Sequence, residues 1–146
     1  MRLDEKTALL TALPTFRVLE PQAVHVLAFS ASLRTLQAGE QLFRKDEASD
    51  GGYIVAAGRI ALNPDGVTPM GAEMAEPGML IGEAALVAET VRPATAIAVE
   101  PSTVLVISRS VMRQVLEAHP DSAARLHAHV AHALSGQHAA LKGLAS

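Results

Sequence analysis

The spacing of apolar residues along the first part of the chain predicts short helices. Leucines recur at helical spacing within residues 3–12, and Pro14 ends that pattern. A second helix is predicted over residues 20–29, where Pro21 occupies the position that a proline favours in a first helical turn. Its apolar face is formed by Val24, Leu27 and Ala28. We therefore expect residues 1–32 to form N-terminal helices.

The pattern changes between Leu33 and Ile107, where short apolar stretches alternate with turn-forming residues. Clear turn signals are Asp50-Gly51-Gly52, Asn63-Pro64-Asp65-Gly66 and Pro77-Gly78. Frequent turns between short strands are typical of an antiparallel barrel or sandwich. Residues 33–107 are therefore predicted to be the β-structured part of the chain.

A helical pattern returns after the predicted strands, over residues 108–144. Ser108 is suited to cap a helix over residues 109–118, and His119-Pro120 interrupts the chain after it. Asp121 is predicted to cap a final helix that extends to about Leu141.

Composition narrows the class of protein. A chain of 146 residues with 49% hydrophobic residues is long enough to form one domain with a full core. Its net charge of −3 disfavours a nucleic-acid-binding surface, and it contains no cysteine for disulfides or thiolate metal sites. No apolar run is long enough to span a membrane, and residues 1–12 do not resemble a secretory leader. We expect a single domain in a reducing cytoplasm.

The segment GMLIGEAALVAETVRPATAIA, residues 78–98, contains the residues with the clearest chemistry; we call it the cassette. Gly82 allows close approach of the backbone, Glu83 supplies a hydroxyl acceptor, and Arg92 supplies a forked cation suited to a phosphate. These groups together are suited to bind a sugar phosphate in a small concave site.

The cassette resembles the phosphate-binding cassette of cyclic nucleotide-binding domains, which has a GE pair, small apolar residues, a spacer and an arginine. AGEQLFRKD (38–46), GGYIVAAGRI (51–60), EPGMLIGE (76–83) and ISRSVMRQVLEAHPDSAARL (107–126) also resemble family blocks, without gaps and in the family's order. The similarity is greatest to the catabolite activator protein group of bacterial cyclic-AMP receptors. Essentially the whole chain is covered.

The resemblance implies a β fold with flanking helices: an eight-stranded antiparallel β-roll (a double-stranded β-helix, jelly-roll-like) with N-terminal helices and a long C-terminal helix. One domain would cover residues 1–146. In the catabolite activator group a hinge and a helix-turn-helix domain follow that last helix, whereas this chain stops near Ser146. We therefore expect no DNA-reading module and no direct DNA binding.

The resemblance also implies the roles of individual residues. Gly82 would place its N–H against the ribose or phosphate, Glu83 would accept a hydrogen bond from the ribose 2′-hydroxyl, and Arg92 would bind the phosphate. Cyclic AMP or cyclic GMP is the implied ligand, with no other cofactor. The family register places base-contacting residues at Gln137 and His138. The other expected ligand-binding positions are Ala84, Ala85, Pro93 and Ala94.

Pro93 departs from the family pattern, which has a small residue with a backbone N–H at this position. Proline has no N–H to donate to a phosphate, and it favours extended geometry at Arg92. A charge-assisted hydrogen bond contributes roughly 1.5–3 kcal/mol, so its loss weakens binding by about 10- to 100-fold. Pro93 is also compatible with a purely structural role at the first residue of a strand.

Other interpretations of the same residues remain open. Glu83 and Arg92 are also compatible with a salt bridge that only holds the turn, and Arg92 with a position on the surface. Four histidines of the last helix and His119 suggest a metal site, but helical spacing gathers only His129 and His132 on one face. We expect no metal site, and histidines that lie on a solvated face or in a dimer seam.

The last helix also carries apolar residues at alternating steps of three and four, which is typical of a short coiled-coil seam. We expect a homodimer through residues 121–144; the alternative is a helix that packs on its own roll. The seam positions are Leu126, Val130, Ala133, Gln137, Leu141 and Leu144.

These features favour a non-enzymatic sensor module that binds a cyclic nucleotide and signals through the last helix to a separate output protein. The alternative is a degenerate, ligand-free roll that serves dimerisation or partner docking. An enzyme is disfavoured, because the sequence offers no nucleophile–base pair, catalytic carboxylate pair or metal cage, and hydrolysis of a cyclic phosphate normally needs metal ions.

Overall fold

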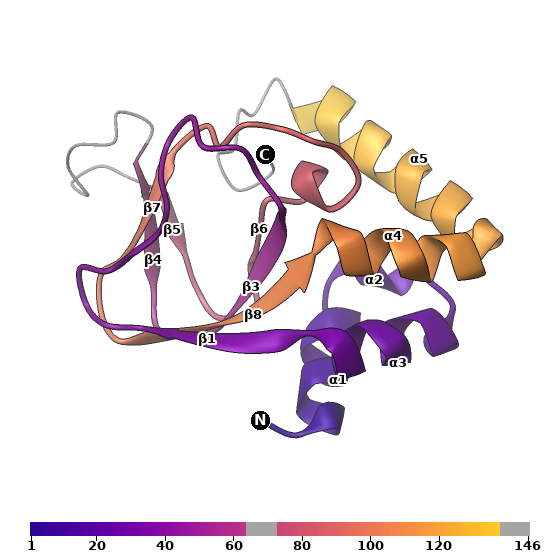
Figure 1. Ribbon diagram of the computed structural model, residues 1–146, viewed down its shortest axis with the longest axis horizontal. Helices are drawn as coiled ribbons and strands as arrows, with labels where there is room; N and C mark the ends of the chain where they lie inside the picture. Colours follow the sequence, from indigo (N-terminus) through magenta and orange to yellow (C-terminus); the bar gives the residue numbers. More distant parts are fainter. Residues whose placement is uncertain (64–72, 138–146) are drawn as a thin grey trace.

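The computed structural model describes residues 1–63 and 73–137 of the chain. Within them, helices lie at both ends of the sequence and strands lie between (Figure 1). The helices are α1 (Leu3–Thr11), α2 (Pro14–Arg17), α3 (Pro21–Ser30), α4 (Arg109–Ala118) and α5 (Pro120–Gln137), with a short 3₁₀ helix η1 (Ala84–Leu86). None of these helices is long and apolar enough to cross a membrane.

In the described part of the chain, eight strands form two antiparallel four-stranded sheets, which confirms the predicted β-roll. One sheet has the order β1-β8-β3-β6 and the other β2-β7-β4-β5. The strands are β1 (Ser32–Leu36), β2 (Gln41–Phe43), β3 (Gly51–Ala57), β4 (Ile60–Asn63), β5 (Glu73–Ala75), β6 (Leu80–Ile81), β7 (Thr95–Ala98) and β8 (Ser102–Ser108).

Among the residues that the structure describes, two hydrophobic cores lie on opposite faces of the sheet that contains β3. Side chains alternate along a strand, so Ile54 joins the core under the helices while Tyr53 and Val55 join the core between the two sheets. Figure 1 shows the helices gathered on one side of the strands. The inter-sheet core contains the rings of Phe43 and Tyr53, which lie beside Arg92 of the cassette.

The predicted helices are found, with two differences at prolines. Ser108 caps α4 as expected, because its hydroxyl accepts a hydrogen bond from the N–H of Val111 at 3.1 Å. Pro14 begins α2 instead of only ending the first helical pattern. The final helix begins at Pro120, so Asp121 lies within its first turn and is not its cap. Both prolines occupy a first helical position, where a missing N–H has no cost.

Helix α5 is anchored to its own chain. Leu126 is fully buried and Val130 nearly so, both in the core beneath the helices. Arg125 Nε donates to the carbonyl of Val18 at 2.6 Å, and the Ser122 hydroxyl accepts from the N–H of Glu20 at 2.9 Å. Leu126 and Val130, the first two positions of the expected dimer seam, are therefore packed against their own chain. Leu141 and Leu144 lie outside the described residues.

Candidate ligand-binding site

The cassette turns sharply between β6 and η1, and Gly82 makes that turn. Its φ of +83° lies in the left-handed region, which side chains with a Cβ rarely adopt. A Cβ at this position would also lie 2.8 Å from Nη1 of Arg92. The turn therefore favours glycine here, and a Cβ would also force the guanidinium of Arg92 to shift. Gly82 and Arg92 lie close together in the structure.

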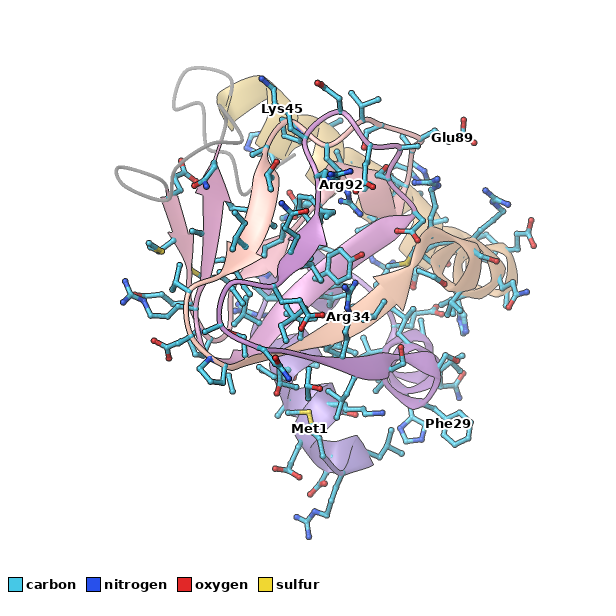
Figure 2. The ribbon with its side chains drawn as sticks, turned by 60° about the vertical axis from the view of Figure 1, so that its left-hand side comes forward. Met1, Phe29, Arg34, Lys45, Glu89 and Arg92 are labelled. Carbon is cyan, nitrogen blue, oxygen red and sulfur yellow. The ribbon has the colours of Figure 1, made fainter. Side chains whose placement is uncertain are left out.

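Arg92 is buried inside the roll, with a side chain only 3% exposed. Nη2 donates to the carbonyl of Gly51 at 2.9 Å and lies 3.6 Å from a carboxylate oxygen of Asp50. The guanidinium carbon is 4.3 Å from the ring centroid of Phe43 and 5.5 Å from that of Tyr53. Figure 2 shows Arg92 among the strands, while Glu89 and Phe29 point away from the ribbon. A surface position for this arginine is excluded.

The charge of Arg92 is only partly compensated by the described residues. A guanidinium has five N–H donors, and one of them makes a hydrogen bond to a backbone carbonyl within the described part of the chain. The carboxylate of Asp50 is 87% exposed, so water screens its attraction to the cation. Burial lowers the pKa of Arg92, which reflects the cost of removing the cation from water. An anion at this position would offset that cost.

The space beside Arg92 is small. The cavity has a volume of about 10 Å³, which is room for about one water molecule. The rings of Phe43 and Tyr53 stack beside the guanidinium, with their centroids 5.9 Å apart. A nucleotide therefore fits only if these side chains or the neighbouring loop move. The cavity is lined by Phe43, Leu62, Ile81, Gly82, Arg92, Pro93 and Ala94.

Glu83 faces the helices instead of Arg92. Its Oε2 accepts a hydrogen bond from the hydroxyl of Thr15 in α2 and lies 3.4 Å from Nε2 of His129 in α5. The sequence left open a salt bridge between Glu83 and Arg92. In the structure Glu83 contacts Thr15 and His129 instead. The structure brings Gly82 and Arg92 together and holds the carboxylate of Glu83 elsewhere.

Sequence reasoning missed Arg109, which connects the cassette to α4. Its Nη1 donates to the carbonyls of Ala85 and Ala88, both at 3.0 Å, and Nη2 donates to the carbonyl of Ser49 at 2.9 Å. Arg109 is the first residue of α4, where the helix dipole disfavours a cation. The sequence did carry one indication of this role. An arginine directly after the Ser108 cap is unfavourable for the helix itself, which indicates that its side chain has partners in another segment.

The other predicted positions lie as follows. Ala85 and Ala94 are buried, Ala84 is half-buried, and Pro93 is exposed at the rim of the small cavity. Gln137 is the last described residue of α5, with a side chain outside the described part, and His138 lies beyond the described residues. Among the residues that the structure describes, no group of acidic residues and histidines could hold a metal ion.

Fold and cassette together define a β-roll of the cyclic nucleotide-binding type. The family model described as "Cyclic nucleotide-binding domain" matches residues 33–119. The chain belongs to this family. No match is found among curated proteins.

Three solved structures are similar over most of their length. A cyclic nucleotide-binding-like protein from Brucella abortus is 34% identical, with 78% of this chain and 99% of that chain covered and a TM-score of 0.67. The N-terminal domain of a transcriptional regulator from Streptomyces coelicolor is 28% identical, with 92% of this chain and 95% of that chain covered and a TM-score of 0.76. The sensor domain of the transcriptional regulator DNR from Pseudomonas aeruginosa is 25% identical, covers 92% of both chains, and has a TM-score of 0.74.

Replacing Gly82 by alanine tests how tightly Arg92 is held. Gly39 has a similar φ of +87°, but a Cβ there would have no atom within 4 Å, so Gly39→Ala is the matched control. We expect Gly39→Ala to lower the free energy of unfolding by about 1–2 kcal/mol through backbone strain. Gly82→Ala should cost about 1–3 kcal/mol more, because the new methyl group displaces a packed guanidinium. Denaturant unfolding measures both; equal losses would show that Arg92 moves aside freely.

Tyr53 gives a second, spectroscopic prediction. Burial, followed by the charge of Asp50, raises the pKa of Tyr53 above its ordinary value of 10, against a lowering effect of Arg92. The stabilisation from the neutral phenol is complete below about pH 10 and is lost as the pH rises through the folded-state pKa. Tyr53 is the single tyrosine and the chain has no tryptophan, so near-ultraviolet absorbance follows its ionisation directly. The midpoint should lie higher in the native protein than in denaturant; identical midpoints would contradict the prediction.

Proposed function

We propose that this chain is a non-catalytic regulatory module that binds the phosphate of a cyclic nucleotide at Arg92. The observation that carries the proposal is the buried guanidinium, which is 3% exposed and lacks a buried counter-charge among the described residues. A cyclic phosphate carries one negative charge and acceptor oxygens that suit the planar fork of arginine. The backbone around Gly82–Ala85 would lie on the opposite side of the phosphate.

Ligand binding would have to open a closed site. The cavity of about 10 Å³ does not hold a nucleotide, so Phe43, Tyr53 or the cassette must move when the phosphate arrives. Any such shift of the cassette would reach α4, because Arg109 is bonded to the carbonyls of Ala85 and Ala88. The ligand would then change the helical arrangement to the extent that it binds one arrangement more tightly than the other.

We propose that α5 transmits this change to a separate output protein. Helix α5 follows α4 directly and also contacts Glu83 of the cassette through His129. A catalytic role is not part of the proposal, since domains of this family typically regulate other proteins or domains.

A second candidate function is a ligand-independent docking or dimerisation module. It is favoured by the small cavity beside Arg92 and by Pro93, which has no N–H for a phosphate. In that case the stacked rings of Phe43 and Tyr53 would be the permanent neighbours of Arg92. Nucleotide binding distinguishes the two candidates directly.

Binding of cyclic AMP and cyclic GMP should be measured by calorimetry and by the fluorescence of Tyr53, whose ring lies 5.5 Å from the guanidinium. Arg92→Ala should abolish binding, because it removes the buried cation. Pro93→Ala should tighten binding by about tenfold or more, because it restores one phosphate donor. Arg44→Ala changes the net charge equally at an exposed position and should leave affinity within about twofold.

The outcomes separate the two candidate functions. Binding that Pro93→Ala strengthens and Arg92→Ala removes would support a weakened but intact site. Absence of binding in both the native chain and Pro93→Ala would contradict the nucleotide proposal and favour the docking module.

We further propose that the chain forms a homodimer through residues 121–144. Because Leu126 and Val130 are buried within the monomer, the described part of the contact would use the outer face of α5, where Ala128 is exposed. Light scattering at tens of micromolar should give twice the monomer mass. Ala128→Arg should reduce the mass to that of a monomer, whereas Gln114→Arg, exposed on α4, should not. A monomer mass for the native chain would end this proposal.

A further inference from the structure

The carboxylate of Glu83 connects three segments that are distant in the sequence. Thr15 lies in the first turn of α2, Glu83 lies immediately before η1, and His129 lies in the middle of α5. The Thr15 hydroxyl donates to Oε2 of Glu83, and Nε2 of His129 lies 3.4 Å from the same oxygen. The cassette therefore contacts helices from both ends of the chain through one acidic side chain.

The contact is largely shielded from water. The side chain of Glu83 is 14% exposed and that of His129 27%, while Thr15 is 3% exposed. A buried hydroxyl without an acceptor costs free energy, and a largely buried carboxylate needs donors. The hydrogen bond from Thr15 to Glu83 satisfies both groups, and His129 lies beside the same carboxylate oxygen. These partners stabilise one orientation of the carboxylate.

That orientation points away from the site of the proposed ligand. The cavity at Arg92 is lined by Gly82 but not by Glu83, although the two residues are adjacent in the chain. A cyclic nucleotide offers a ribose hydroxyl beside its phosphate, and a carboxylate is a strong acceptor for a hydroxyl. To accept that hydrogen bond, Glu83 would have to leave Thr15 and His129.

We propose that Thr15 and His129 are specificity-determining positioning residues, which hold Glu83 against the helices and so make α5 and the ligand's 2′-hydroxyl compete for one carboxylate. The inference rests on the proposed nucleotide site at Arg92. Its consequence is that the native chain recognises the phosphate and discriminates little between nucleotides with and without the 2′-hydroxyl. By linkage, a ligand that does engage Glu83 weakens the contact between α5 and the cassette to the same extent.

The variants that test this proposal should remain folded. Helix α5 is also held by buried Leu126 and Val130 and by the hydrogen bond from Arg125 to Val18. Directly before it, His119 contacts Glu20, with Nδ1 at 2.6 Å from the carboxylate. His129→Ala removes one of several anchors. Thr15→Val keeps the shape of the buried side chain and removes the hydroxyl, and Thr15→Ser keeps the hydroxyl.

The first experiment needs no ligand. Glu83→Ala, His129→Ala and the double variant form a double-mutant cycle for the unfolding equilibrium in denaturant. We expect a coupling of about two- to fivefold in the equilibrium constant, as for a partly exposed ion pair or hydrogen bond. The exposed His132 on the same helix provides the control, and Glu83→Ala with His132→Ala should show no coupling. A coupling factor of one between Glu83→Ala and His129→Ala would overturn the proposed contact.

The second experiment compares the affinities for cyclic AMP and 2′-deoxy cyclic AMP. In the native chain the ratio should lie within about threefold of one. In His129→Ala and Thr15→Val it should rise to about tenfold, because the released carboxylate can accept the 2′-hydroxyl. Thr15→Ser and His132→Ala should keep the native ratio. A general loss of structure would not raise the ratio, and it would show separately in the unfolding transitions measured in denaturant.

The two measurements distinguish failure of the inference from failure of the proposed function. If both nucleotides bind and the ratio of their affinities is the same in all variants, the competition for Glu83 is overturned and the Arg92 site remains in place. Absence of binding by either nucleotide in every variant would overturn the Arg92 proposal and, with it, the competition. The double-mutant cycle would still report whether His129 holds Glu83.

Discussion

The buried guanidinium of Arg92 constrains the residues that surround it inside this β-roll. Arg92 enters the inter-sheet core and lies between the rings of Phe43 and Tyr53 and the carbonyl of Gly51. Its position leaves little room for a side chain at residue 82, because a Cβ there would lie 2.8 Å from Nη1 unless the guanidinium shifted. A cation in this environment is stabilised by ring faces and by a carbonyl, but an anion would stabilise it more. The residues around it thus form a packed interior that compensates the charge of the guanidinium only in part.

The cassette is joined to the helices by contacts on both sides of its short 3₁₀ helix. Arg109 binds the carbonyls of Ala85 and Ala88, and Glu83 binds Thr15 and lies beside His129. Neither contact belongs to the hydrophobic core. Arg109 joins backbone carbonyls of the cassette to α4, and Glu83 joins the cassette to α2 and α5. Directional contacts of this kind have discrete arrangements, which is what a regulatory domain needs if a small shift at its ligand site is to change its surface.

Local sequence patterns predicted helices on either side of an antiparallel β structure, because these elements depend on short-range chemistry, and the family resemblance supplied the eight-stranded roll. Alternating turn residues and short apolar runs marked the strands of two antiparallel sheets, and Ser108 marked the start of α4. The two differences both concern prolines. Pro14 and Pro120 begin helices, although a proline is equally able to end one, and only the chain geometry on each side distinguishes these roles. Likewise, the apolar spacing of α5 was compatible with a partner helix or with its own roll, and the structure buries Leu126 and Val130 in its own core.

For the site, the sequence alone determined which groups are available: a flexible glycine, an acceptor carboxylate, a forked cation and a proline without an N–H. The family resemblance implied that Gly82 and Arg92 belong to one site, and the structure excludes the surface position that the sequence had left open for Arg92. The direction of Glu83 was decided only by tertiary structure. A glutamate side chain rotates freely, so its position depends on which donors lie near it, and these are supplied by Thr15 and His129 from segments far away in the chain. The surroundings of Arg92 depend on tertiary packing in the same way, because Phe43 and Tyr53 belong to different sheets and both rings lie beside the guanidinium.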